Sequence, residues 1–357
     1  MIHTSANREM KNSLSSAASG LVHACDRHFQ TVADFLRRHS RVLSVMSRAN
    51  HRRAMFVALF TLWLANTEAL AADNPISYHY ASVDGIKVFY REAGNPKRPT
   101  ILLMHGIPTS SQMFRDLIPR LAADFHVIAP DFVGMGNSDA PSASAFDATQ
   151  DNLSLFMEKF IRQTVPLPTI LYMQDLGGPI GMRIATRHPE WISGLIFQNT
   201  PISLAGWRPE RIKPMLALTG PVTDGERSEQ ANRNWPATDV YLYKTGARSP
   251  EALDPDAWAI DAYALNQPES RRIIAAYLAD ARLSFSLYPE WQSYLRERQP
   301  TTLVVWGTRD PVFDVAGVAD IKNAVPAANV YLYETGHFAL QEDGADIARR
   351  IITTFAH

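Results

Sequence analysis

The sequence predicts an α/β fold, a doubly wound and mostly parallel β-sheet with an inserted helical cap. Short apolar strands alternate with helical segments up to residue 200 and again after residue 300, which is the pattern of a parallel sheet covered by helices. Between them the chain has helical segments and many aromatic side chains but no clear buried strand. An insertion after which the same core resumes is typical of a cap domain. We therefore expect a core of residues 72–200 and 301–357 and a cap of residues 201–300.

The composition is that of an ordinary globular protein. The chain has 357 residues, of which 46% are hydrophobic and 20% charged, and its formal net charge is −1. This charge gives no electrostatic reason to expect a nucleic acid as a partner. The chain has one cysteine, Cys25, so we expect no intramolecular disulfide and no thiolate metal cluster. Because no dinucleotide fingerprint or phosphate loop is present, we also expect no cofactor.

The segment before the core has the features of an export signal. Residues 46–71 begin with basic side chains, continue with an apolar run at 54–65 and end in Ala-x-Ala, which predicts a secretory signal peptide. The alternative is a buried helix. Since export signals begin at the N-terminus, we interpret residues 1–45 as an extension that is unstructured or not translated. The mature protein would begin near Ala72 and be periplasmic or secreted, or cytoplasmic if the extension blocks export.

The elements of the core follow in order. Residues 77–83 and 86–92 alternate like a hairpin around Asp84 and Gly85, which favour a tight turn. The next strands are short and apolar, as in a buried parallel sheet, and we place them at residues 100–104, 126–129, 169–173, 192–199, 302–306 and 330–333. We expect helices at residues 110–121, 146–163, 177–188, 318–324 and 345–355.

Residues 169–181 contain the feature around which the site is predicted. An apolar strand is followed by Asp175 at a corner and by a helix that Gly177 and Gly178 open. This is the pattern of a nucleophile elbow, a sharp turn that lifts one side chain into the site. The two glycines permit the close approach of strand and helix that such a turn needs. Asp175 alone could equally be a helix N-cap.

Two further side chains complete a candidate catalytic triad with Asp175. Asp310 and His337 follow the last two predicted strands. Carboxyl ends of parallel strands line the ligand crevice of an open α/β sheet, so we expect all three residues to meet there. Taken singly, His337 could be a structural histidine and Asp310 a turn residue. Asp314 is a poorer candidate for the acid, because it lies beyond Pro311.

From about Ser77 to the end, the chain resembles the α/β-hydrolase branch that contains epoxide hydrolases and haloalkane dehalogenases. The resemblance rests on five segments, HGIPTSS at 105–111, PDFVGMG at 130–136, QDLGG at 174–178, WGTRDP at 306–311 and GH at 336–337. It implies that Asp175 attacks carbon and forms an alkyl ester on the enzyme. The pair of His337 and Asp310 would then activate a water molecule that cleaves this ester.

The chemistry of a carboxylate agrees with this role. A carboxylate is ionised at neutral pH and needs no base to activate it, and it can displace a group at a saturated carbon. His337 would then act only in hydrolysis, as the general base for water. The oxyanion hole requires main-chain N–H groups, which we assign to Ile107 and Leu176.

The predicted leaving group is an epoxide oxygen. The haloalkane dehalogenases of the branch that the chain resembles bind the halide with side-chain N–H donors at two positions. Here those positions hold Leu176 and Ile107, whose side chains cannot donate a hydrogen bond. The resembled epoxide hydrolases use two cap tyrosines, and the segments around Tyr241 and Tyr288 are similar to those that carry them. We therefore expect Tyr241 and Tyr288 to bind the epoxide oxygen, although cap aromatic residues can also serve packing alone.

Three alternatives stay open. A cap-borne halide site would make the protein a haloalkane dehalogenase, and the tryptophans that could form it are Trp207, Trp235, Trp258 and Trp291. A fluoroacetate-type enzyme is less expected, because no Arg follows Asp175. The fold could also serve as a non-catalytic binding module. The expected partners are a small to medium apolar substrate and water, for a monomer or homodimer with no stable membrane span after signal cleavage.

Overall fold

The computed structural model describes residues 75–356 of the 357-residue chain. The predicted extension and signal peptide, residues 1–71, lie outside the described residues. Among the helices of residues 75–356, none is long and apolar enough to cross a membrane.

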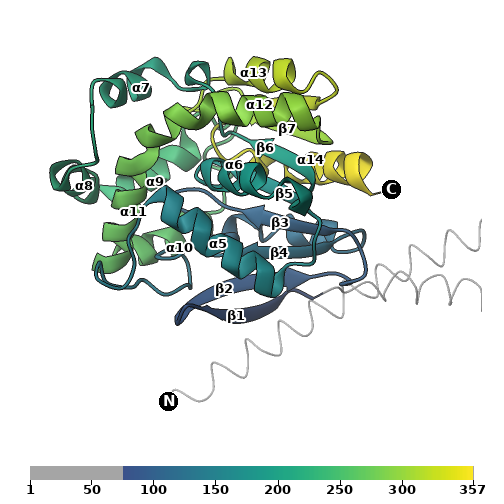
Figure 1. Ribbon diagram of the computed structural model, residues 1–357, viewed down its shortest axis with the longest axis horizontal. Helices are drawn as coiled ribbons and strands as arrows, with labels where there is room; N and C mark the ends of the chain where they lie inside the picture. Colours follow the sequence, from purple (N-terminus) through teal and green to yellow (C-terminus); the bar gives the residue numbers. More distant parts are fainter. Residues whose placement is uncertain (1–74, 357) are drawn as a thin grey trace, which may run out of the picture. The chain divides into compact units, whose positions relative to one another are not determined.

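Eight strands form one sheet in the order β1-β2-β4-β3-β5-β6-β7-β8 (Figure 1). They are β1 (Ser77–Val83), β2 (Ile86–Ala93), β3 (Thr100–Met104), β4 (His126–Pro130), β5 (Thr169–Gln174), β6 (Ile192–Gln198), β7 (Thr302–Gly307) and β8 (Asn329–Tyr333). β2 pairs antiparallel with β1 and β4, and all other neighbours are parallel. The predicted doubly wound, mostly parallel sheet is confirmed. The strand order reverses beside β3, which places the loops after β3, β4 and β5 next to one another.

Helices cover both faces of the sheet. The core helices are α4 (Ile118–Leu121), α5 (Gln150–Thr164), α6 (Gly177–Arg187), α13 (Gly317–Ala324) and α14 (Leu340–Phe355). Successive side chains of a strand point to opposite faces. On β5, Met173 therefore joins the apolar core under α5, α6 and α13, whereas Tyr172 joins the core under α4 and α14. Figure 1 shows α5 and α6 together on one face.

Three helices differ from the sequence prediction. Helix α5, expected from residue 146, begins at Gln150 after the N-cap Thr149. The helix expected at residues 110–121 is divided into a short 3₁₀ helix, Ser111–Phe114, and α4. Pro119 lies in the first turn of α4, where its missing N–H is tolerated, but it could not continue an earlier helix. Helix α14 begins at Leu340 rather than at residue 345. Gly344 concealed this first turn, because glycine has a low helix propensity.

The inserted segment is helical. It contains α7 (Pro209–Leu216), α8 (Asp224–Ala231), α9 (Trp235–Lys244), α10 (Asp256–Leu265), α11 (Pro268–Asp280) and α12 (Tyr288–Arg298), with short 3₁₀ helices at Leu204–Gly206 and Ala281–Leu287. Helices α7 to α11 gather beyond one end of the strands, on the left of Figure 1. Helix α12 instead packs against α6 and α13, so the last turns of the insertion lie on the core.

Candidate active site

Asp175 lies at the corner between β5 and α6 in a left-handed backbone conformation, with φ of 47°. This conformation is unfavourable for a residue with a side chain, and such strained residues tend to cluster at functional sites. The elbow is tight, since a Cβ atom on Gly177 would overlap the backbone of Met104 and one on Gly178 would overlap Thr200. Both glycines of the predicted elbow are therefore required by packing.

The two carboxylate oxygens of Asp175 have different surroundings. Oδ1 accepts hydrogen bonds from the main-chain N–H of Ile107 at 2.8 Å and of Leu176 at 2.6 Å. Oδ2 lies 3.7 Å from Nε2 of His337 and accepts no hydrogen bond within residues 75–356. The structure thus brings the two N–H groups assigned to the oxyanion hole onto one oxygen and leaves the other oxygen available for reaction.

His337 and Asp310 form a buried pair, each with 0% exposure. Nδ1 of His337 lies 2.9 Å from Oδ2 of Asp310. A carboxylate accepts hydrogen bonds, so Nδ1 carries the proton and Nε2 of the neutral ring is an acceptor facing Asp175. Asp314 instead pairs with Arg208 at 2.8 Å. The structure therefore places Asp310, and not Asp314, beside the histidine.

Burial and charge act on both titratable groups. Burial raises the pKa of Asp175, and the charge of His337 and the two N–H donors oppose this shift only in part. Burial by itself lowers the pKa of His337. The charge of Asp310, its hydrogen bond and the charge of Asp175 outweigh burial, so the pKa of His337 is raised overall.

The loops after β3 and β4 hold the N–H of Ile107 in place. His105 accepts from the N–H of Phe132 through Nε2 and donates through Nδ1 to the carbonyl of Gly106, each at 2.9 Å. Burial lowers the pKa of His105, which favours the neutral ring that these two bonds require. Asp131, in the loop after β4, accepts a hydrogen bond from the main-chain N–H of Ser111, in the loop after β3. The HGIPTSS and PDFVGMG segments therefore support the loop that carries the N–H of Ile107, one of the two donors predicted for an oxyanion hole.

A small cavity of about 50 Å³ opens onto Asp175. Most of its wall is apolar, and the lining residues are Ile107, Gln150, Asp175, Leu176, Pro179, Thr200, Pro201, Trp207, Leu278, Ala281, Ser284, Tyr288 and Phe313. Tyr288 is buried, and its phenolic oxygen accepts a hydrogen bond from Nε1 of Trp207 at 2.8 Å. The phenolic proton has no acceptor among residues 75–356, so it remains available to a ligand. The hydroxyl of Thr200, by contrast, already donates to the carbonyl of Asp175.

The structure does not bring Tyr241 to this cavity. Its side chain is 46% exposed on α9. Tyr243 occupies the buried side of the same helix, where it donates to Asp261 at 2.9 Å. Side chains two residues apart on a helix point in widely different directions. Because Tyr243 is buried, Tyr241 on the same helix faces outward. The predicted pair of tyrosines is therefore reduced to Tyr288.

The four tryptophans considered for a halide site are also separated. Trp207 alone lines the cavity. Trp235 is buried elsewhere and donates to the carbonyl of Gln230, and Trp258 packs on Tyr243. Trp291 lies behind Tyr288, with ring centroids 5.3 Å apart.

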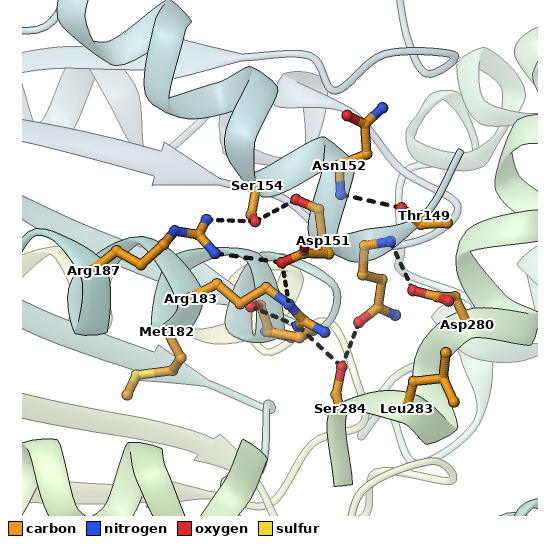
Figure 2. Close-up of polar contacts among 12 residues, drawn as sticks. Thr149, Asp151, Asn152, Ser154, Met182, Arg183, Arg187, Asp280, Leu283 and Ser284 are labelled. Carbon is orange, nitrogen blue, oxygen red and sulfur yellow. Dashed lines mark hydrogen bonds and ion pairs between the residues drawn. The ribbon is translucent and has the colours of Figure 1, made fainter. Parts of the chain in front are cut away.

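A polar network that includes Arg183 and Ser284 (Figure 2) borders the cavity, because Ser284 and Gln150 are among the lining residues. Ser284 donates to Oε1 of Gln150 at 2.7 Å and accepts from Nη1 of Arg183 at 3.1 Å. Arg183 is only 5% exposed. Burial lowers the pKa of Arg183, and the charges of Asp151 and Asp280 oppose this shift. A buried cation therefore lies one side chain away from the cavity.

Sequence reasoning missed Asn199 and Gln174. Asn199 follows β6 in a left-handed conformation, with φ of 43°, and its Nδ2 donates to Oδ2 of Asp310 at 2.7 Å. Its place at the carboxyl end of a predicted strand, like that of Asp175 and Asp310, was an available signal. Gln174 precedes the elbow and contacts His337. The prediction drew no inference from it, although it stands in the matched QDLGG segment.

Comparison with known proteins places the chain in a family. Residues 99–345 match the family model described as the alpha/beta hydrolase fold. An uncharacterized hydrolase of Saccharomyces cerevisiae is 35% identical over 290 residues, which cover 76% of this chain and 94% of the yeast protein. A haloalkane dehalogenase of Mycobacterium marinum is 28% identical over 302 residues, covering 78% of this chain and 94% of the relative.

Solved structures show the same fold. The haloalkane dehalogenase DatA of Agrobacterium tumefaciens C58 superposes with a TM-score of 0.64 at 20% identity, covering 79% of this chain and 96% of that one. A serine hydrolase involved in carbazole degradation, CarC, superposes with a TM-score of 0.62 at 22% identity, covering 78% and 98%. The protein belongs to the α/β-hydrolase fold family, in the branch that contains haloalkane dehalogenases and epoxide hydrolases.

Proposed function

We propose that the protein is a hydrolase in which Asp175 forms an alkyl ester with the substrate, and His337 with Asp310 hydrolyses that ester. The unequal surroundings of the Asp175 oxygens carry the proposal. Oδ1 is held by two N–H groups and Oδ2 by none. Hydrogen bonds stabilise negative charge, so Oδ2 is the more nucleophilic oxygen. After it attacks, Oδ1 becomes the ester carbonyl and already lies in the oxyanion hole.

We propose an epoxide as the substrate, because Tyr288 presents an uncommitted phenolic proton to the cavity. Oδ2 of Asp175 attacks a ring carbon, the C–O bond breaks, and the ring oxygen keeps the electron pair and takes the proton of Tyr288. The oxygen stays in the product, so a hydrogen-bond donor at this place stabilises the charge that develops on it. A cavity of about 50 Å³ favours a small, largely apolar epoxide.

Hydrolysis then uses the other side of the site. A water molecule gives a proton to Nε2 of His337 while its oxygen attacks Cγ of Asp175, and Oδ1 takes up the negative charge. The bond between Cγ and Oδ2 breaks, and the leaving alkoxide takes the proton from His337. The proton on the regenerated carboxyl group returns to the Tyr288 phenolate through solvent. The sum is the addition of one water molecule to one epoxide.

Haloalkane dehalogenation is the second candidate. The 28% identical relative from Mycobacterium marinum carries that name, and Tyr288 could donate to a departing halide as well as to an oxygen. The usual side-chain donors beside the nucleophile are replaced by Leu176 and Ile107, so a halide would depend on Tyr288 alone. This leaves dehalogenation less well supported than epoxide opening.

Intact-protein mass spectrometry of the His337→Gln variant tests the proposal and separates the two candidates. Ester formation does not need the histidine, whereas hydrolysis does, so the alkyl-enzyme should accumulate. An epoxide adds its whole mass, and a haloalkane adds its mass less one hydrogen halide. Peptide mapping should locate the adduct at Asp175, and the double variant Asp175→Asn with His337→Gln should acquire none. An adduct on another residue would overturn the mechanism, and adducts from haloalkanes only would select the second candidate.

A further inference from the structure

Gln174, the last residue of β5, contacts the catalytic histidine from inside the core. Its side chain is 0% exposed. Its Nε2 lies 2.9 Å from Nε2 of His337, whereas Oδ2 of Asp175 lies 3.7 Å from that atom. The amide oxygen of Gln174 has no hydrogen-bond partner among residues 75–356. A buried carbonyl without a donor is costly, so this arrangement calls for a physical reason.

The direction of the hydrogen bond follows from the tautomer. Asp310 fixes the proton on Nδ1 of His337, so Nε2 of the neutral ring can only accept. The amide N–H of Gln174 therefore donates to the same nitrogen that must take a proton from the hydrolytic water. In the resting enzyme, Nε2 of His337 thus accepts a hydrogen bond from the buried amide of Gln174.

The space around Gln174 is limited. A Cβ atom on Gly106 would overlap both the amide oxygen of Gln174 and the carboxylate of Asp175. In this packing the nitrogen end of the amide faces Nε2 of His337 and the oxygen end faces Gly106.

We propose that Gln174 is a positioning residue for the hydrolysis step. It donates to neutral His337 in the resting enzyme and yields Nε2 to the attacking water, so it favours the neutral ring that the base requires. The unpaired amide oxygen is then the cost of directing the amide nitrogen at the histidine. This inference rests on the proposed function, since it concerns the step in which His337 acts as the base.

The effect of the contact on the histidine has a definite sign. Donation to Nε2 stabilises the neutral ring and opposes Asp310 and Asp175, which raise the pKa of His337. The positive charge of Arg211 also lowers this pKa. Loss of the amide in Gln174→Leu should therefore raise the pKa of His337. The carboxylate of Gln174→Glu should raise it further, because it favours the imidazolium ion.

Single-turnover kinetics across pH test the inference. In Gln174→Leu, ester formation should keep its wild-type rate, and the low-pH limb of ester hydrolysis should move to higher pH. At pH values below the pKa of His337, hydrolysis should slow about tenfold for each unit by which this pKa rises. In Gln174→Glu the limb should move further in the same direction. Gln174→Met keeps the length of the side chain and serves as the second variant if Gln174→Leu does not fold.

Gln198 offers a matched control. It pairs with Gln174 across β5 and β6, is likewise 0% exposed, and has an amide nitrogen without a partner among residues 75–356. Its amide oxygen accepts from Tyr172 rather than touching His337. Gln198→Leu removes a buried amide of the same size and should leave the limb of ester hydrolysis in place. An equal shift in both variants would reduce Gln174 to a structural role and overturn the inference.

A titration without substrate separates this inference from the proposed function. The His337 imidazole can be followed by NMR in the wild type and in Gln174→Leu, with the signal assigned through its loss in His337→Gln. A raised pKa in Gln174→Leu supports the contact even if no substrate is turned over. Unchanged titration, or an unchanged limb in a variant that forms and hydrolyses the ester, overturns the inference and leaves the proposed function standing.

Discussion

Nε1 of Trp207 donates a hydrogen bond to the phenolic oxygen of Tyr288 at 2.8 Å, inside the cavity that opens onto Asp175. A hydroxyl that accepts from an indole directs its own proton elsewhere, and here the remaining direction is the cavity. The indole of Trp207 thus orients the phenolic hydroxyl of Tyr288. In our proposal, this pair replaces the two tyrosines expected from the sequence.

Removing the phenolic hydroxyl should slow ester formation. In Tyr288→Phe we expect the rate of epoxide opening to fall about 10²- to 10³-fold, the typical loss for one such donor, while the ring keeps its packing on Trp291. Stopped-flow or rapid-quench measurement of alkyl-enzyme formation gives this rate. Tyr241→Phe is the matched control, and its 46% exposed side chain predicts a wild-type rate. Equal losses in both variants would mean that the geometry has selected the wrong donor.

Removing the indole N–H should have a smaller effect of the same kind. Trp207→Phe keeps an aromatic ring between Phe285 and Phe313, on which Trp207 packs edge-on, but it no longer orients the Tyr288 hydroxyl. We expect a loss of about tenfold in ester formation, which corresponds to one ordinary hydrogen bond. Because Trp207 acts through Tyr288, the double variant should be no slower than Tyr288→Phe. Additive losses would show that Trp207 contacts the substrate independently.

The sequence was informative about the core and much less so about the cap. Asp175, Asp310 and His337 each follow a strand that is recognisable as a short apolar run, and strand ends meet at one edge of a parallel sheet whatever the loops do. Tyr241 lies on a cap helix, where its direction depends on helix phase and on packing between helices. Helix α9 contains both Tyr241 and Tyr243, and only the fold decides which of them is buried.

The same difference explains why the roles of Gln174 and Asn199 could not be inferred from the sequence. Both act through contacts with side chains far along the chain, Gln174 with His337 and Asn199 with Asp310. A polar residue next to a strand end is compatible with many roles. Its partner becomes visible only when the strands are placed side by side.

The pH dependence of hydrolysis should differ from that of the free enzyme. In the free enzyme the negative charge of Asp175 contributes to the raised pKa of His337. Ester formation neutralises Asp175, so the pKa of His337 should fall in the intermediate. Hydrolysis needs the neutral ring and should therefore persist to lower pH than the titration of the free enzyme suggests. Single-turnover hydrolysis rates and an NMR titration of the free enzyme give the two values. If the pKa of His337 obtained from the hydrolysis rates equals or exceeds the pKa titrated in the free enzyme, this coupling is contradicted.

Two buried carboxyl groups in the cap should limit stability at neutral pH. Asp239 and Asp261 are 1% and 2% exposed, and neither oxygen of Asp239 has a hydrogen-bond partner among residues 75–356. Burial raises the pKa of both groups, and the charge of Asp261 raises that of Asp239 further. A raised carboxyl pKa means that the folded state binds the proton more tightly than the unfolded state. Stability should therefore decline as pH rises above the ordinary value of about 4.

Asp239→Asn tests this effect by replacing one of the two carboxyl groups with a neutral amide. We expect it to raise the free energy of unfolding at pH 8 by about 1 kcal/mol or more, and the gain should shrink toward pH 4, where both proteins are uncharged at this position. Thermal or denaturant unfolding at the two pH values measures it. Glu229→Gln, at an exposed carboxylate of α8, should change stability little at either pH. A gain in Asp239→Asn that is independent of pH would point to packing instead of charge.

The unequal oxygens of Asp175 predict where the oxygen of water goes. If Oδ2 attacks the substrate and Oδ1 stays in the oxyanion hole, water attacks Cγ and Oδ2 leaves with the product. In a single turnover in water enriched in heavy oxygen, the first product should therefore carry no label, and the peptide containing Asp175 should gain one labelled oxygen. Product from later turnovers should be labelled, because Asp175 now donates the heavy atom. Asp175→Asn should give neither labelled peptide nor product. Label in the first product, with an unlabelled Asp175, would mean that water attacks the substrate directly and that no ester is formed.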